Sequence, residues 1–202
     1  MLKFIIALVL IAGIQGGKVC LPKGWVLEWT FPTLKEIGFK LTLDADTSAN
    51  FGWVGVGFKY ESEAGIAMVG ADITNIIFDD TFSDRVALTN GMPDEDKKYK
   101  GTDDLYGLSS TFEDGIRTFT WVRPANSGDD KDKIYTIGKV YKLLWACGDV
   151  IDGIQMKHFT VDRDVTLLTL DAGFEGGCST DEETPSDGEI PDMDDDSFVD
   201  LV

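Results

Sequence analysis

The chain has 202 residues, which is enough for one domain with a sizeable hydrophobic core. Its apolar fraction of 43% is that of a globular protein, and its 22 glycines with little helical periodicity predict β structure. The formal net charge of −18, with nothing resembling a basic patch, excludes a nucleic-acid-binding protein.

Residues 1–17 are predicted to be a secretory signal peptide. Lys3 supplies the positive end, residues 4–14 form an apolar run of h-region length, and Gly16 and Gly17 are small residues suited to cleavage. The alternative is a transmembrane anchor, but eleven apolar residues are too few to cross a bilayer core of ~30 Å. We therefore expect a secreted protein, or one in the lumen of the secretory pathway, with no membrane span after cleavage.

Short segments of alternating apolar and polar residues, separated by turn residues, follow in chain order. They predict strands at residues 25–29, 38–43, 53–58, 72–78, 81–88, 105–111, 116–122, 140–148 and 165–170. Residues 44–50 are a polar turn with spaced aspartates, but Ala49 and Gly55 replace the glycine and the glutamate of a calcium loop, so we predict no calcium there. The pattern predicts an all-β fold over residues 18–178, an antiparallel β-sandwich of two packed sheets.

Three cysteines follow the predicted signal, Cys20, Cys147 and Cys178. In an oxidising compartment one pair is expected to form a disulfide bond; three pairings are open, and we favour Cys20 with Cys178 because they bracket the domain. One histidine is too few for a zinc site with these cysteines. Residues 179–202 hold ten acidic and no basic residues, which predicts a solvated disordered tail; the alternative is an electrostatic handle for a basic partner or a cation.

The stretch from residue 51 to residue 72 is the most informative. In the predicted strand 53–58 one face buries Val54, Val56 and Phe58, and on the other face Gly55 and Gly57 carry no side chain. Another sheet, a loop or a flat ligand is then expected to lie close to the backbone there. Met68 follows on a segment adjacent to this cleared face.

His158 is the only histidine, and it lies in the long connection 149–164. Taken singly, Met68 is more simply a core residue and His158 a surface or core residue. Together they suggest a haem, because two axial ligands on opposite faces of a flat macrocycle must come from segments distant in sequence. Met156 is too near His158 to serve, and Met92, in a charged loop, remains an alternative. Without a C-x-x-C-H motif, only non-covalent haem b is available.

Several motifs, taken in order and spacing, resemble the DOMON domain over residues 20–175. They are residues 53–58, 68–72, 91–93, 118–123 and 144–148, followed by His158. The resemblance implies an immunoglobulin-like β-sandwich that binds one b-type haem or a sugar. In the haem-binding branch, which is similar to the cytochrome domain of cellobiose dehydrogenase, a methionine and a histidine ligate the iron; carried over by position, these are Met68 and His158.

The sequence departs from the DOMON pattern in two respects. The strand that usually ends Ala-Tyr-Gly reads Ala146-Cys147-Gly148 here, and no oxidoreductase or transmembrane reductase domain is attached. The redox partner protein is therefore unidentified.

Filled axial positions leave no open site on the iron, so we expect one-electron transfer, with enzymatic activity left uncertain. Trp53 and Phe58 are candidates to line the haem, with core packing as the alternative. Arg123 is a candidate partner for a haem propionate, with an ordinary surface position as the alternative.

The competing class is a binding module for carbohydrate or a partner protein. In that case Met68 is merely packed, His158 is exposed, and Tyr99 and Tyr106 stack on sugar rings. A third alternative is an accessory subunit of an extracellular assembly, docked through its acidic tail. A visible spectrum separates the first two classes.

Overall fold

The computed structural model describes residues 16–64 and 68–178. Most of the predicted signal peptide and the whole predicted acidic tail at 179–202 lie outside the described residues. The first strand begins at Gly16, two residues before the predicted start of the domain at residue 18.

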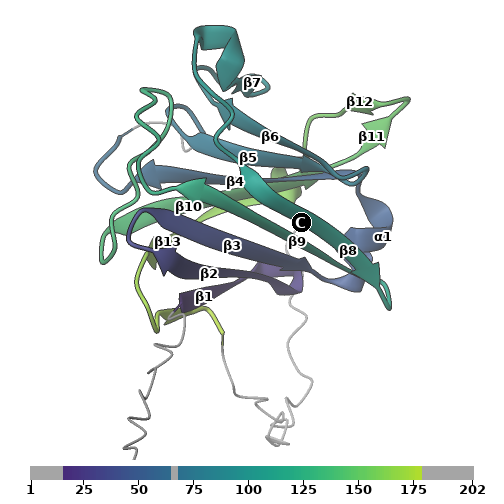
Figure 1. The fold of residues 1–202 in the computed structure, drawn as a ribbon. Coiled ribbons are helices and arrows are strands. Elements are labelled where there is room, and N and C mark those ends of the chain that lie inside the picture. Colours follow the sequence, from purple (N-terminus) through teal and green to yellow (C-terminus); the bar gives the residue numbers. More distant parts are fainter. Residues whose placement is uncertain (1–15, 65–67, 179–202) are drawn as a thin grey trace, which may run out of the picture.

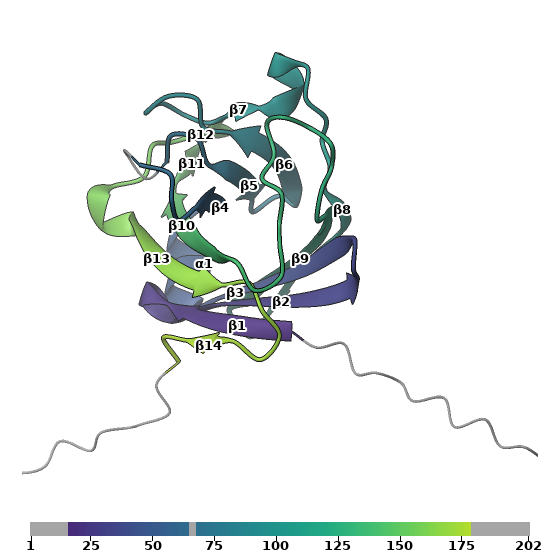
Figure 2. The ribbon, with the colours of Figure 1, turned by 90° about the vertical axis from the view of Figure 1, so that its left-hand side faces the viewer.

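Two six-stranded sheets pack face to face (Figures 1 and 2). The first sheet has the order β14 (Glu175–Gly176), β1 (Gly16–Leu21), β2 (Trp25–Thr33), β3 (Glu36–Leu43), β9 (Ile116–Pro124), β8 (Tyr106–Glu113). The second has the order β13 (Arg163–Thr169), β10 (Val140–Gly148), β4 (Trp53–Tyr60), β5 (Asp72–Ile77), β6 (Thr81–Val86), β7 (Asp94–Glu95). Neighbouring strands are antiparallel, apart from the short parallel pairing of β1 with β14. The prediction of an all-β, immunoglobulin-like antiparallel sandwich is confirmed.

The connections contain short helical turns and one small hairpin. Residues 44–50, predicted to be a polar turn, include α1 (Ala45–Asn50), whose N-terminus is capped by the Asp44 carboxylate accepting from the Thr47 amide. The other turns are η1 (Pro22–Gly24), η2 (Asp96–Tyr99) and η3 (Thr160–Asp162), and the hairpin pairs β11 (Val150–Ile151) with β12 (Ile154–Gln155). None of the helices in the described ranges has the length and apolar character needed to cross a membrane.

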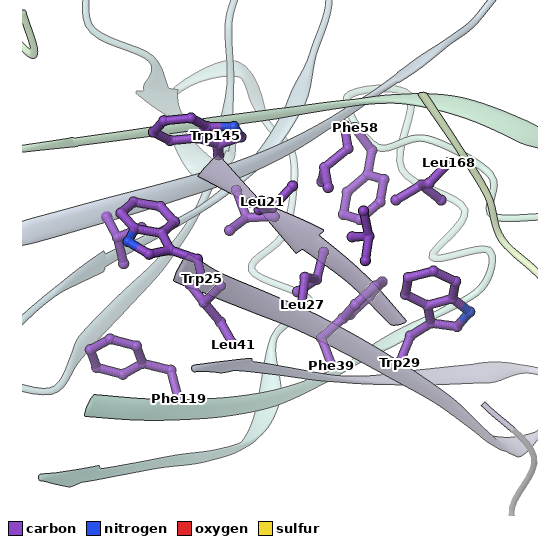
Figure 3. Close-up of a cluster of buried hydrophobic side chains, with 14 of the residues drawn as sticks. Leu21, Trp25, Leu27, Trp29, Phe39, Leu41, Phe58, Phe119, Trp145 and Leu168 are labelled. Carbon is purple, nitrogen blue, oxygen red and sulfur yellow. The ribbon is translucent and has the colours of Figure 1, made fainter. Parts of the chain in front are cut away.

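The core lies between the two sheets and is rich in aromatic side chains (Figure 3). As the alternation predicts, Val54, Val56 and Phe58 of β4 point into it, and Phe58 packs against Phe39 of β3 with ring centroids 5.3 Å apart. Full burial of one such large apolar side chain stabilises the fold by about 1.5–3 kcal/mol. The face of β4 that carries Gly55 and Gly57 therefore points away from the core.

A disulfide bond joins Cys20 to Cys178, as predicted, and Cys147 is a free, buried thiol on β10. Burial raises the pKa of the Cys147 thiol to about 12, which leaves it protonated and unreactive at neutral pH. A structural disulfide fits the extracellular space or the lumen of the secretory pathway.

Replacing both Cys20 and Cys178 by serine is expected to lower the free energy of unfolding by about 2–5 kcal/mol. The bond closes a loop with a sequence separation of 158 residues, so its loss restores much chain entropy to the unfolded state. Urea unfolding of the double variant and the wild type measures the difference, and Cys147→Ala serves as a control that keeps the bond. Equal unfolding curves for the double variant and the wild type would refute a stabilising role.

Candidate functional site

The outer faces of the two sheets differ in character. The outer face of the first sheet carries ion pairs such as Lys40 with Glu28, together with a hydrogen bond from the Tyr106 hydroxyl to Glu36. The outer face of the second sheet carries an apolar group that we call the outer apolar cluster: Ala71, Ile73 and Ala87, with Met68 and Leu144 packed against them. The second sheet is therefore the one with an apolar outer surface.

Gly55 and Gly57 lie beside this cluster on β4. A Cβ added at Gly57 would lie 2.9 Å from Ile73 Cγ1, so the glycine lets Ile73 lie across the strand. A Cβ added at Gly55 would meet Trp53 Cζ3 at 3.5 Å and Ile73 Cγ2 at 3.8 Å, with no third neighbour within 4 Å among the described residues. Gly55 and Gly57 are both buried, so the part of β4 without side chains is covered by the neighbouring side chains of Trp53 and Ile73.

Trp53 anchors the loop that carries His158. Its indole N–H donates to the Met156 carbonyl oxygen at 2.9 Å, across 103 residues of sequence. A Cβ at Gly148 would lie 2.7 Å from Trp53 Nε1, so this glycine makes room for the indole. One strand further along, the side-chain amides of Asn75 and Gln155 exchange two hydrogen bonds of 3.2 and 2.9 Å. The loop is thus fixed at two points to the second sheet.

His158 is half-buried next to Trp53, with ring centroids 6.4 Å apart. Its Nδ1 lies 3.2 Å from the Phe159 carbonyl oxygen, which can only accept, so Nδ1 carries the proton and Nε2 keeps its lone pair. Burial lowers the pKa of His158, and the nearby charges of Arg163 and Lys157 lower it further. The ring is therefore neutral at pH 7 and ready to act as a metal ligand.

The structure brings Met68 and His158 to the same outer face. Met68 is half-buried in the outer apolar cluster at the Gly57 end, because Gly57 pairs with Ile73 across β4 and β5. His158 lies at the other end, beside Trp53. The two predicted ligands therefore lie toward opposite ends of β4 on this outer face.

Two of the predicted haem-contacting residues lie elsewhere. Phe58 is buried between the sheets, on the opposite face of β4 from Gly55, so the core-packing alternative holds (Figure 3). Arg123 is only 2% exposed and donates to Asp72 at 2.7 Å. It is neither a surface arginine nor available to a propionate on the outer face, because the alternation of β9 turns it inward with Phe119 and Trp121.

The tyrosines proposed to stack on sugars use their hydroxyls within the protein. Tyr99 in η2 donates to Asp94 at 2.7 Å, and Tyr106 in β8 donates to Glu36 at 2.7 Å. Met92, the alternative ligand, is exposed in the segment before β7. Met68, by contrast, packs in the outer apolar cluster.

Sequence reasoning missed the cations near His158. Arg163 is exposed at the start of β13, and its charge and that of Lys157 act on the imidazole. Further along β13, Val165 and Leu167 are on the same face of the strand, and Leu167 is 53% exposed. If the period-two alternation of this strand is continued back to residue 163, it places Arg163 on the same face as Val165 and Leu167, and this pattern could have indicated the cation.

A group of aspartates around Arg123 was also missed. We call it the aspartate cluster: Asp72, Asp84, Asp96, Asp104, Asp129 and Asp132. Burial raises the pKa of Asp84 to about 7, against the opposing charge of Arg123, and burial with the charges of neighbouring aspartates raises the pKa of Asp96 to about 8. These residues lie far apart in sequence, so spacing alone gave no sign of the group.

The two packed antiparallel sheets define a β-sandwich module. The family model of the DOMON domain matches residues 23–148, which is more than half of the chain. The chain therefore belongs to the DOMON domain family. The match includes Met68 and ends ten residues before His158. A comparison with curated proteins finds no match.

Proposed function

We propose that this DOMON domain binds one haem b on the outer face of the second sheet, with Met68 and His158 as axial ligands, and transfers single electrons. The observation that carries the proposal is the surroundings of Gly55. There the two glycines of β4 carry no side chain, only the side chains of Trp53 and Ile73 cover Gly55, and a thioether lies toward one end and a neutral imidazole toward the other.

The residues on this face suit a haem, which is a flat apolar ring with two acidic propionates at one edge. Trp53 and Ile73 lie next to Gly55, and Leu167 and Phe159 expose 53% and 67% of their surface, area that such a group would cover. Arg163 and Lys157 would place positive charge near its propionates. Arg163 and Lys157 thus replace Arg123 as the proposed partners of the haem propionates.

Bound haem would supply reversible one-electron chemistry. The chain would fix its orientation and potential. The Trp53–Met156 bond and the Asn75–Gln155 pair hold the loop that presents His158, and the Phe159 carbonyl fixes its tautomer. A neutral thioether from Met68 favours the ferrous state. With both axial positions taken, electrons would pass to an unidentified redox partner protein outside the cytosol.

One observation favours a second function, a module that binds a partner protein. Phe159, Val161 and Leu167 form exposed apolar positions on and beside the His158 loop, and such positions occur at interaction surfaces. In that function Met68 only packs, and the protein is colourless. A carbohydrate ligand is another form of this alternative, because the hydrogen bonds of Tyr99 and Tyr106 use their hydroxyls and not the ring faces that would stack on a sugar.

The visible spectrum of the purified protein, before and after haem addition, tests the proposal. We expect a sharp Soret band and split α and β bands on reduction. The Gly55→Val variant should weaken haem affinity at least about tenfold, because it would add a branched side chain on the strand face proposed to carry the ring. A valine suits a strand, so the fold should persist.

Thr120→Val on β9 is the matched control, because it adds a valine to the outer face of the opposite sheet. It should leave haem affinity unchanged. A protein that stays colourless with added haem would refute the cytochrome proposal. Equal affinity in Gly55→Val and the wild type would refute this face as the site.

A further inference from the structure

Three carboxylates of the aspartate cluster converge from two loops at one end of the sandwich. Asp104, Asp129 and Asp132 each offer a carboxylate oxygen, and these three oxygens lie within 4.8 Å of one another. Asp104 follows η2, which extends beyond β7 (Figure 1), and the other two lie in the loop after β9. This convergence is independent of the haem site, which is on the outer face of the second sheet.

Two members of the cluster are buried without a hydrogen bond, and one of them, Asp96, also lacks an ion-pair partner among the described residues. Asp96 is 1% exposed, and neither of its carboxylate oxygens accepts a hydrogen bond from the described residues. The Asp132 side chain is 2% exposed and likewise accepts none from them, although one of its oxygens lies 3.1 Å from a guanidinium nitrogen of Arg123. A buried carboxylate in this condition is strongly unfavourable unless a cation or a proton compensates it.

The Asp132 carboxyl also faces other acceptors. It lies within hydrogen-bonding range of the carboxyls of both Asp96 and Asp104, with no donor between them among the described residues. Carboxyl oxygens at such range are stable only when a shared proton or a bound cation lies between them.

The positive charges nearby are already engaged. Arg123 reaches Asp72 at 2.7 Å, Asp132 at 3.1 Å and Asp84 at 3.8 Å. Lys131 pairs with the exposed Asp130, while its charge also acts on Asp129. Three of the six carboxyl groups therefore share one buried guanidinium, and Lys131 lies near Asp129.

The two loops are fixed against each other. Asp129 accepts from the Thr102 amide at 2.6 Å and from the Lys131 amide at 2.9 Å, and the Asp104 amide donates to Asp84 at 3.2 Å. A Cβ at Gly101 would lie 2.5 Å from Asp129 Oδ2, so only a glycine allows this approach. The carboxylates are thus held in place rather than free to separate.

We propose that Asp104, Asp129 and Asp132, with Asp96 beside them, bind a calcium ion. Ligand oxygens at 2.3–2.6 Å from Ca²⁺ lie up to ~5 Å apart, which matches the observed spread of the three oxygens. The ligands are all hard oxygen atoms on irregular loops, which suits the variable geometry of calcium better than the strict octahedron of Mg²⁺. We expect a Kd of about 10⁻⁴ to 10⁻³ M, as in extracellular modules.

Calorimetric titration and thermal unfolding of the full secreted chain test the proposal. Addition of about 5 mM CaCl₂ should raise Tm by about 2–8 °C relative to EDTA, and MgCl₂ at the same concentration should have a much smaller effect. Asp129→Asn and Asp104→Asn should each weaken calcium binding at least about tenfold. Both residues are partly exposed, so these variants are expected to fold.

Asp130→Asn is the matched control, because Asp130 is the exposed neighbour of Asp129 and lies outside the cluster. It should behave as the wild type, and weak binding by the acidic tail should persist in all variants without raising Tm. Absence of a calcium-dependent rise in Tm would overturn the proposal in favour of a shared proton. An equal rise in Asp129→Asn, Asp104→Asn and Asp130→Asn, or an equal effect of Mg²⁺, would overturn the assigned site or ion.

Discussion

The His158→Ala variant is expected to lose at least about 100-fold in haem affinity, with loss of the sharp Soret band. The imidazole is the stronger of the two proposed ligands, and its Nδ1–H is already committed to the Phe159 carbonyl, which directs Nε2 to the metal. Met68→Ala is expected to retain haem with an altered spectrum and a lower reduction potential, since the thioether favours ferrous iron. Haem titration and spectroelectrochemistry measure both effects.

Met156→Ala is the matched control for this pair. Met156 is an exposed methionine two residues before His158, and its contact with Trp53 is made by the main-chain carbonyl, which alanine retains. Its spectrum and affinity should equal those of the wild type. If Met156→Ala or Met92→Ala changed the spectrum while Met68→Ala did not, the assignment of the sixth ligand would be wrong.

The Arg123→Met variant is expected to lose about 3–5 kcal/mol of unfolding free energy at pH 8. Its guanidinium is the buried partner of Asp72 and Asp132, at 2.7 and 3.1 Å, and it also lies over the Tyr135 ring. Methionine keeps much of the volume but leaves the carboxylates without their counter-charge. Urea unfolding measures the loss.

The loss should be smaller at pH 5.5 than at pH 8. In the wild type, burial already raises the pKa of Asp84 to about 7. Between the pKa of the unfolded state and this value, the folded state binds more protons than the unfolded state. The free energy of unfolding therefore falls as pH rises through that range. Removing Arg123 raises the pKa of Asp84 further, which extends that fall to higher pH. A loss independent of pH would show that packing, and not charge, explains the effect.

Lys40→Met provides the comparison with a surface ion pair. Lys40 and Glu28 form a 2.7 Å ion pair on the outer face of the first sheet, where both side chains are well exposed. The expected change is below about 1 kcal/mol, because water and salt screen such pairs. If the two variants lost the same stability, burial of the Arg123 network would have no energetic consequence.

The strands and their facing were largely predictable because they rest on local signals. The period-two alternation of β4 and β10 and the turn residues between strands required no knowledge of the partners. The errors also have local causes. β1 was missed because it adjoins the apolar signal-like run, and the aspartates of residues 44–50 proved to begin a capped helix.

The sequence by itself thus determined the two-sheet sandwich, the inward face of β4 and the choice of Met68 and His158 as residues worth testing. Only the tertiary structure decided what Arg123 does, which tautomer His158 adopts and which aspartates meet. Those outcomes depend on contacts such as Trp53 with Met156 and Arg123 with Asp72, across 103 and 51 residues. No local pattern encodes such contacts, because they arise when separate strands and loops pack and exclude water.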